Sequence, residues 1–498
     1  MSEQLMIWGG AGLYVAAMLL VGFWAHRRIH QSADFIVAGR RLPLWLATAT
    51  LSATWFGGAT VLGAGGAAYE KGFLGVIPDP FGAGLCLFIA GVLVVRTVRR
   101  MRLLTVADFF RLRFGRHADL VASGALSLAY VGWTAAQIVV IGKVLYALAD
   151  MNPVLGMVIG AVVVVTYTYF GGMWAVTITD FLQIIILVLG LIIMLPLVIA
   201  ACGGLSAYLS GVPEGSFSLV PPAGTDSLGW LNWFRAWIVI GLGNLAGQDL
   251  LQRSFSSRDE RVAQNSAYLS GIFYLTFGLI PLFIGLAARI LLPEAAFEDP
   301  ELVIPIMARE FLPAPLMALF LGALISAIMS SADSALLVPS SIIGQNLLRF
   351  FRPGVSQQSV LVWSRRSVPL VGLLALGMAL MLPRAYELLV ESFALLLVVL
   401  FVPFMAGIWW KRANTPGALT AMVVGFVTYA ALKWATQDDA GDVLAVALAG
   451  IAMVAVSLKT AKTHPPRPLS DLEGRPIPLE GRLGLPGAPV APEPEAGS

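Results

Sequence analysis

The chain has 498 residues, of which 58% are hydrophobic and only 12% are charged, and its formal net charge is +3. Soluble proteins carry about 25% charged residues, so this composition excludes a soluble globular protein and predicts an integral membrane protein. The small net charge gives no basis for nucleic-acid binding, and the two distant cysteines, Cys86 and Cys202, exclude a disulfide framework.

Apolar segments of about 20 residues, long enough to cross a bilayer, recur along nearly the whole chain. The first lacks a basic amino-terminal region and a cleavage site, so we expect a retained span rather than a signal peptide. We predict one transmembrane domain over residues 1–458, followed by a disordered Pro/Gly-rich tail over residues 459–498. The 13 predicted spans lie near residues 5–25, 43–70, 74–95, 121–148, 154–171, 178–201, 233–251, 266–292, 313–347, 367–383, 386–410, 416–435 and 441–458.

Basic residues predict the orientation of these spans. Lys and Arg cluster after the odd-numbered spans, as in "RTVRRMR" (96–102) and Lys411–Arg412, whereas the opposite loops carry almost none. Cytoplasmic loops are enriched in Lys and Arg. The pattern therefore predicts a multi-pass protein of the plasma (inner) membrane, with its N-terminus outside and its C-terminus in the cytoplasm.

The second predicted span contains a poor helix-forming stretch, "SATWFGGATVLGAGG" (52–66). Glycine in a helix costs about 1 kcal/mol relative to alanine. Non-helical backbone at membrane depth is tolerated only where it lines protein or water, so we predict a break at Trp55, Phe56, Gly57 and Gly58. For the later glycines of this stretch we favour close helix packing.

A second break is predicted in the seventh span, where "GLGNLAGQDLLQR" (241–253) interrupts an apolar run. Its polar and small residues include Asn244, Gly247 and Gln248. Two discontinuous helices, five spans apart, are typical of transporters built from inverted repeats, with the binding site at the breaks.

Intramembrane carboxylates and hydroxyls mark two further segments. Asp180 begins the sixth span, and "ALISAIMSSADSALLVPSS" (323–341) in the ninth carries Ser330, Ser331, Asp333 and Ser334. A carboxylate within the membrane is a functional hypothesis by default. These oxygen ligands suit an alkali cation, whereas a transition metal would require His or Cys, which are absent from these segments.

Four of these segments together resemble the sodium:solute symporter family, and in detail the branch that contains high-affinity choline transporters. They are "SATWFGGATVLG" (52–63), "YTYFGGMWAVTITDFLQ" (167–183), "LGNLAGQDLLQRSFSS" (242–257) and "ALISAIMSSADSALL" (323–337). The resemblance implies a LeuT-type core of five plus five inverted helices over spans 2–11, with one extra N-terminal and two extra C-terminal helices.

The resemblance also implies a sodium site between the first broken helix and the ninth span. It assigns the backbone carbonyls of Ala53, Phe56 and Ala327 and the hydroxyls of Ser330 and Ser331 as ligands.

Some family members have a second sodium site, which would correspond to Asp180, Asp333 and Ser334. Aspartate stands at 333 where some relatives have serine.

The implied solute site is less complete. Choline transporters of this family enclose the quaternary ammonium in an aromatic cage, as cation–π energetics favour. Trp55 and Trp133 match two walls, but Gly247 and Leu389 replace two others, so an amino-acid-like zwitterion or betaine fits as well as choline. The predicted solute-binding residues are Trp55, Gly57, Gly58, Trp133, Gln137, Asn244, Gly247 and Gln248.

The sequence thus predicts a secondary active symporter, not an enzyme, that takes up a small organic solute with Na⁺ across a lipid bilayer. Proton coupling through Asp180 and Asp333 is an alternative, and a channel or sensor is an alternative of another class. The oligomeric state and the number of sodium ions stay open.

Overall fold

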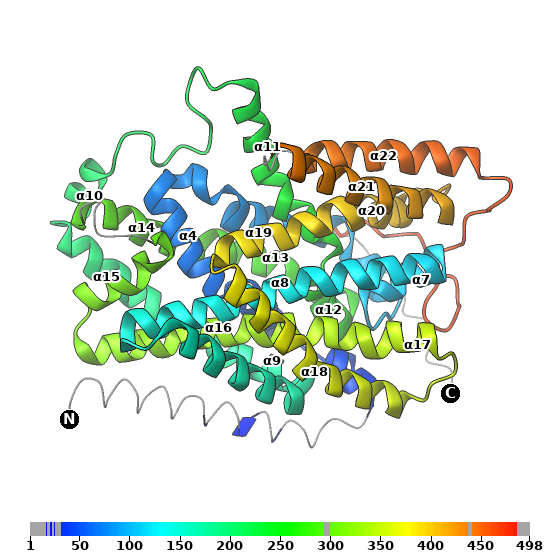
Figure 1. The fold of residues 1–498 in the computed structure, drawn as a ribbon, viewed down its shortest axis with the longest axis horizontal. Helices are drawn as coiled ribbons and strands as arrows, with labels where there is room; N and C mark the ends of the chain where they lie inside the picture. Colours follow the sequence, from blue (N-terminus) through cyan, green and yellow to red (C-terminus); the bar gives the residue numbers. More distant parts are fainter. Residues whose placement is uncertain are drawn as a thin grey trace.

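The structure is helical throughout the part of the chain that it describes. The computed structural model describes residues 16, 20, 21, 24, 31–292, 299–436 and 441–485. Within these ranges there is no β-strand, and nine helices are long and apolar enough to cross a membrane. The first predicted span, residues 5–25, lies almost wholly outside the described residues, so the count of 13 spans stays a prediction. Most long helices run side by side between two ends of the molecule (Figure 1).

The first half of the core begins with a helix that is broken in its middle. α3 (Leu44–Trp55) ends at Trp55 and α4 (Gly58–Lys71) begins at Gly58, as the sequence predicts. The other elements of this half are α2 (Ser32–Val37), η1 (Ala38–Arg40), η2 (Gly72–Val76), η3 (Ile77–Gly82), α5 (Ala83–Leu93), α6 (Val95–Arg100), α7 (Val106–Phe114), α8 (Arg116–Ala149), α9 (Pro153–Ala201) and α10 (Leu205–Gly211).

Helix α9 covers the two predicted spans 154–171 and 178–201. Gly172 divides it, with φ 50° and ψ −162°, values that glycine adopts without steric cost. A side chain at this position would also collide with Phe35 of α2. The boundary between the fifth and sixth predicted spans is therefore a glycine kink with a neighbouring ring packed against it.

The second half repeats the broken-helix arrangement. α11 (Ser227–Gly241) is followed by the short η4 (Gly243–Ala246) and then by α12 (Gln248–Ser256), so the second predicted break is confirmed. The remaining elements are α13 (Glu260–Phe277), α14 (Ile280–Leu291), η6 (Pro300–Leu302), α15 (Val303–Phe311), α16 (Ala314–Ile342), η7 (Ile343–Leu347), α17 (Leu348–Phe351), α18 (Gln357–Met381), α19 (Ala385–Leu396), η8 (Leu397–Phe401), α20 (Val402–Trp409), α21 (Thr415–Thr436) and α22 (Gly441–Lys459).

Glycines of α4 bring this helix against its neighbours. A methyl group at Gly66 would lie 2.5 Å from the carbonyl oxygen of Pro300, and one at Gly63 would lie 3.0 Å from Cβ of Tyr386. Gly285 of α14 approaches the Gly65 carbonyl in the same way. The predicted packing role of these glycines is confirmed, since small residues let helix backbones approach closely within a membrane.

The first part of the C-terminal tail packs against the ends of the core helices. The backbone N–H of Gly484 donates to Val92 O at 2.8 Å, and that of Leu472 donates to Met101 O at 3.2 Å. The Arg100 guanidinium donates to the carbonyls of Pro478 (2.9 Å) and Glu480 (2.7 Å). Up to residue 485 the tail therefore differs from the disorder predicted from composition, because arginines on the core satisfy its carbonyls. Residues 486–498 lie outside the described residues, and there the prediction stays untested. The tail forms the red coil beside α7 and α20 in Figure 1.

Candidate ion and solute site

The first helix break releases a backbone carbonyl. Phe56 has φ −77° and ψ 64° and Gly57 has φ −102° and ψ −172°, so neither residue is helical. The N–H of Gly57 donates to Trp55 O at 2.8 Å instead of to Ala53 O four residues back. The Ala53 carbonyl therefore loses its helical donor at a depth where water is scarce.

Helix α16 meets this break through Ser331. Its hydroxyl is fully buried and donates to the carbonyl of Thr54 at 2.8 Å. A methyl group at Gly57 would lie 2.6 Å from Cβ of Ser331 and 3.4 Å from the carbonyl oxygen of Ala327. Four of the predicted sodium ligands, at 53, 56, 327 and 331, thus belong to two segments in direct contact.

The other predicted hydroxyl ligand, Ser330, faces a different neighbour. It donates to Oδ1 of Asp180, and Thr50 of α3 donates to Oδ2 of the same carboxylate. All three side chains are fully buried. Asp180 is therefore buried inside the helix bundle, and Thr50 is a member of the cluster that sequence analysis missed.

A buried arginine completes this polar cluster. Arg253 of α12 has no exposed surface; one Nη donates to Ser334 and lies 4.0 Å from Asp180 Oδ2. Ser334 also donates to the Ser330 carbonyl (2.8 Å) and contacts Asp333, whose Oδ2 has no hydrogen-bond partner among the described residues. The sequence suggests a basic loop at Arg253, because it follows an apolar span. The structure instead buries the guanidinium near Asp180, Asp333 and Ser334.

The second break is organised around another carboxylate. Gly247 has an extended backbone (φ −71°, ψ 133°), and Asn244 Nδ2 donates to Asp249 Oδ2 at 3.1 Å. The hydroxyl of Tyr130 on α8 donates to the other oxygen of Asp249 and accepts from its N–H at 3.0 Å. Asp249 and Tyr130 were not predicted as site residues, although Asp249 lies within the quoted polar run.

The two predicted glutamine contacts lie in different surroundings. Gln248 accepts from the backbone N–H of Val106 and donates to Leu104 O at 3.4 Å, so it holds α12 against the start of α7. Gln137 of α8 is buried, and its Oε1 has no partner among the described residues. Gln137 therefore offers a free polar group, whereas both ends of Gln248 are engaged.

The predicted aromatic residues belong to two ring groups. Trp55 packs edge-on against Tyr274 of α13, with ring centroids 6.2 Å apart. Trp133 packs against Tyr130 at 5.6 Å and against Phe393 of α19 at 5.8 Å. The structure thus places the two tryptophans in separate groups rather than in one shared ring contact. Leu389 and Gly58 are both buried, and a methyl at Gly58 would lie 2.8 Å from Val140 of α8.

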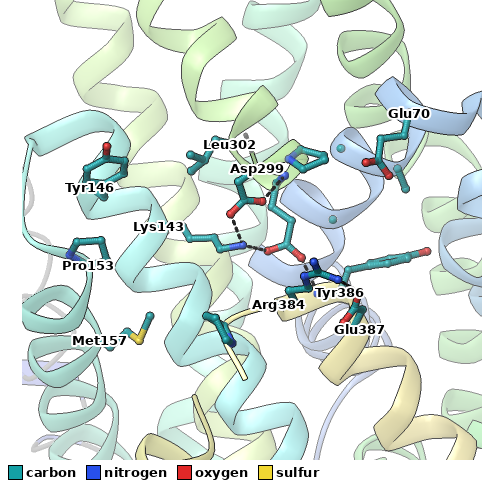
Figure 2. Close-up of a pocket in the computed structure, with 16 residues that line it drawn as sticks. Glu70, Lys143, Tyr146, Pro153, Met157, Asp299, Leu302, Arg384, Tyr386 and Glu387 are labelled. Carbon is teal, nitrogen blue, oxygen red and sulfur yellow. Dashed lines mark hydrogen bonds and ion pairs between the residues drawn. The ribbon is translucent and has the colours of Figure 1, made fainter. Parts of the chain in front are cut away.

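A cavity of about 620 Å³ opens beside α4, the second half of the broken helix, and we call it the vestibule. Lys143 of α8 contacts Asp299 at 2.6 Å and also pairs with Glu301, as Figure 2 shows. Glu301 accepts from the backbone N–H groups of Ala385 and Tyr386 (3.3 and 2.8 Å), which begin α19. One carboxylate therefore joins α8, η6 and α19. The vestibule is also lined by Gly63, Gly66, Glu70, Arg384 and Glu387.

Comparison with known families decides what kind of protein carries this site. The model of the sodium:solute symporter family matches residues 35–425, which is most of the chain. The chain belongs to the sodium:solute symporter family. This symporter is therefore a membrane transporter and not an enzyme, as predicted.

Curated relatives of this symporter carry different solutes. It is 26% identical over 448 residues to the high-affinity choline transporter 1 of Caenorhabditis elegans, covering 83% of this chain and 75% of the relative. It is also 26% identical over 450 residues to the osmoregulated proline transporter OpuE of Bacillus subtilis, covering 88% and 89% of the two chains.

Among solved structures, a Na⁺-coupled sialic acid symporter in a substrate-bound outward-open state superimposes on this symporter with a TM-score of 0.78. The match covers 92% of this chain and 98% of the other, at 20% identity. At this identity the likeness concerns the fold, which is LeuT-like, in agreement with the two broken helices.

Proposed function

We propose that the protein is a sodium-coupled symporter that takes up a small organic solute by alternating access. The observation that carries the proposal is the contact between the first helix break and Ser331 of α16. A released carbonyl at Ala53 and a buried hydroxyl at Ser331 supply hard oxygen ligands, which suit an alkali cation. Sodium bound there would join α3 and α4 to α16, and its inward movement would drive uptake.

The proposal includes an orientation. The tail and the arginines of α6 lie at one end of the bundle, and the vestibule lies between α4, η6 and α19. Because Lys and Arg concentrate in cytoplasmic loops, we assign the tail end to the cytoplasm and the vestibule to the outside of the plasma membrane. The proposal retains 13 spans and an N-terminus outside.

We assign one sodium ion per cycle, at the site of Ala53, Phe56, Ala327 and Ser331. The predicted second site contains the guanidinium of Arg253, which donates to Ser334 and lies 4.0 Å from Asp180. The positive charge of Arg253 opposes the binding of a sodium ion at the same place, since like charges at such distances repel strongly inside a protein. In this proposal Asp180 and Asp333 balance Arg253.

Proton coupling is the second candidate, and the unpartnered Oδ2 of Asp333 favours it. The two candidates predict different measurements on purified protein in liposomes. Sodium coupling predicts that uptake rises and saturates with sodium at fixed pH. Proton coupling predicts that uptake follows the pH gradient at fixed sodium. A channel predicts conductance without saturable, ion-coupled uptake.

The sodium ligand itself is tested with Ser331→Ala. The variant should raise the sodium concentration for half-maximal uptake and for half-maximal thermal stabilisation without solute. Ser340→Ala is the matched control, because Ser340 lies on the same helix and, among the described residues, donates only to the Leu336 carbonyl, at 2.8 Å. Equal sodium dependence in the two variants would remove Ser331 from the site.

A further inference from the structure

Near the first break, one of the two oxygens of a buried carboxylate has no hydrogen-bond partner among the described residues. Asp79 lies in η3 and is 3% exposed. Its Oδ2 accepts from the Thr60 hydroxyl at 2.7 Å, but Oδ1 has no hydrogen-bond partner among the described residues. Leaving a carboxylate oxygen unpaired in such a place costs free energy, so the arrangement indicates a group that binds there.

Asp79 is tied to the break through a single residue. The Thr60 hydroxyl that contacts Asp79 also lies 3.0 Å from the carbonyl oxygen of Trp55, the last residue of α3. Trp55 is 6% exposed, and its indole N–H has no partner among the described residues. Thr60 therefore joins Asp79 to Trp55, and each of these two side chains has one buried polar atom without a partner among the described residues.

Aromatic rings border the same place. Tyr274 packs edge-on against Trp55, and the ring of Tyr386 of α19 lies against Gly63 of α4. Aromatic faces attract cations within about 6 Å, and a carboxylate adds a full opposite charge. No ion pair of Asp79 occurs within the described ranges, so no lysine or arginine of this part of the chain supplies the cation.

The lining of the vestibule comes within about one helical turn of Thr60, the residue that contacts Asp79. Gly63 and Tyr386 line the vestibule, and Gly63 lies one helical turn from Thr60 on α4. Its lining carries four carboxylates, of Glu70, Asp299, Glu301 and Glu387, against two basic side chains (Figure 2). An excess of acidic groups in a concave entrance concentrates cations by long-range attraction.

We propose that Asp79 binds a protonated amine nitrogen of the solute, and that this nitrogen must carry at least one N–H. This inference rests on the proposed function and narrows its solute class. Oδ1 needs a hydrogen-bond donor, which a primary or secondary ammonium supplies and a quaternary ammonium lacks. The solute is then closer to an amino acid or a simple amine than to choline or a betaine.

The experiment compares probes that differ only in N-methylation. Purified full-length protein is titrated with ethanolamine against choline, and with proline against its N,N-dimethyl betaine, in sodium and in potassium. Thermal stabilisation reports the binding of each probe, whether or not that probe is transported. Asp79→Asn removes the charge, Asp79→Glu keeps it, and Glu310→Gln removes an exposed carboxylate outside the vestibule lining as a control.

We expect at least one N–H probe to bind the parent about ten-fold or more tightly than its quaternary partner, since hydrogen bonds to charged groups are strong. Asp79→Asn should lose this preference while its solute-free sodium response stays within about two-fold of the parent, which also shows that it is folded. Asp79→Glu should keep part of the preference.

Three results would overturn the assignment: equal or tighter binding of the quaternary probes by the parent, no response to any probe at millimolar concentration, or an unchanged preference in Asp79→Asn. Failure of the proposed function looks different. In that case sodium has no effect on the parent even before solute is added.

Discussion

Gly57→Ala tests the contact between the broken helix and α16 without removing any polar group. The added methyl would lie 2.6 Å from Cβ of Ser331 and nearer still to its hydroxyl, whereas real Cβ contacts essentially never fall below 3.0 Å. Because Cβ of Ser331 is fixed to the backbone of α16, rotation of the serine cannot relieve the clash. One helix must shift by at least about 0.4 Å.

The energetic cost follows from this overlap. Overpacking a well-filled site costs about 1–3 kcal/mol, and displacement of Ser331 from the Thr54 carbonyl adds about 1 kcal/mol. We expect a loss of about 2–4 kcal/mol in stability and, because the same groups are proposed sodium ligands, a sodium affinity about ten-fold weaker or worse.

The assay is a thermal melt of purified protein over a sodium titration, without solute. Gly124→Ala is the control, since a methyl at that helical position of α8 meets nothing within 4 Å and should stabilise the helix by up to about 1 kcal/mol. If Gly57→Ala matches Gly124→Ala in both melting temperature and sodium dependence, the reasoning about this contact is refuted.

Three further predictions concern buried charges. Asp180→Asn leaves Arg253 without its nearest carboxylate, so we expect about 3–5 kcal/mol of destabilisation, measured as lost monodisperse protein after mild heating; full recovery would contradict it. Glu301→Gln weakens the Lys143 contact but leaves Asp299 as a partner, so the melting temperature should fall modestly and depend less on salt than the parent's. Asp442→Asn removes the 2.7 Å ion pair between α22 and Arg235 of α11, so proteolysis near the start of α22 should accelerate. An unchanged cleavage rate would exclude that role.

The backbone breaks could be predicted from the sequence because they depend on local chemistry. Glycine pairs and polar residues inside an apolar run mark places where a helix is unfavourable, and both breaks occur where these residues stand. The segment that carries Ser331 could be singled out for a similar reason, since hydroxyls and a carboxylate clustered within an apolar span have few other roles inside a membrane. The choice of Ser331 as a ligand came from the family resemblance, and Ser330 and Ser331 contact different neighbours.

The rest of the site depends on contacts between distant segments. Arg253 follows an apolar span and so looks like a loop residue, but its partners come from α9 and α16. Asp79 stands between two prolines, which suggests a surface turn, but in the structure it is buried and accepts a hydrogen bond from Thr60. The contacts of Gln248 could not be predicted either, because its partners Leu104 and Val106 are more than 140 positions away in the sequence.

The described part of the tail, up to residue 485, shows why composition alone is a poor guide to order. Its prolines and glycines are typical of disorder, and no periodic apolar face suggests packing. Order comes from Arg100 and Arg113 on the core, whose guanidinium groups bind carbonyls of the tail.

These guanidinium contacts reach main-chain oxygen atoms, which every amino acid possesses. Exchanging Pro478 or Glu480 for most other residues would leave the acceptors of Arg100 in place. We therefore expect the amino-acid sequence of this segment to vary widely among related proteins, while its backbone path and the arginines that bind it are conserved. Alignments of the tail alone would then understate how strictly its position is specified.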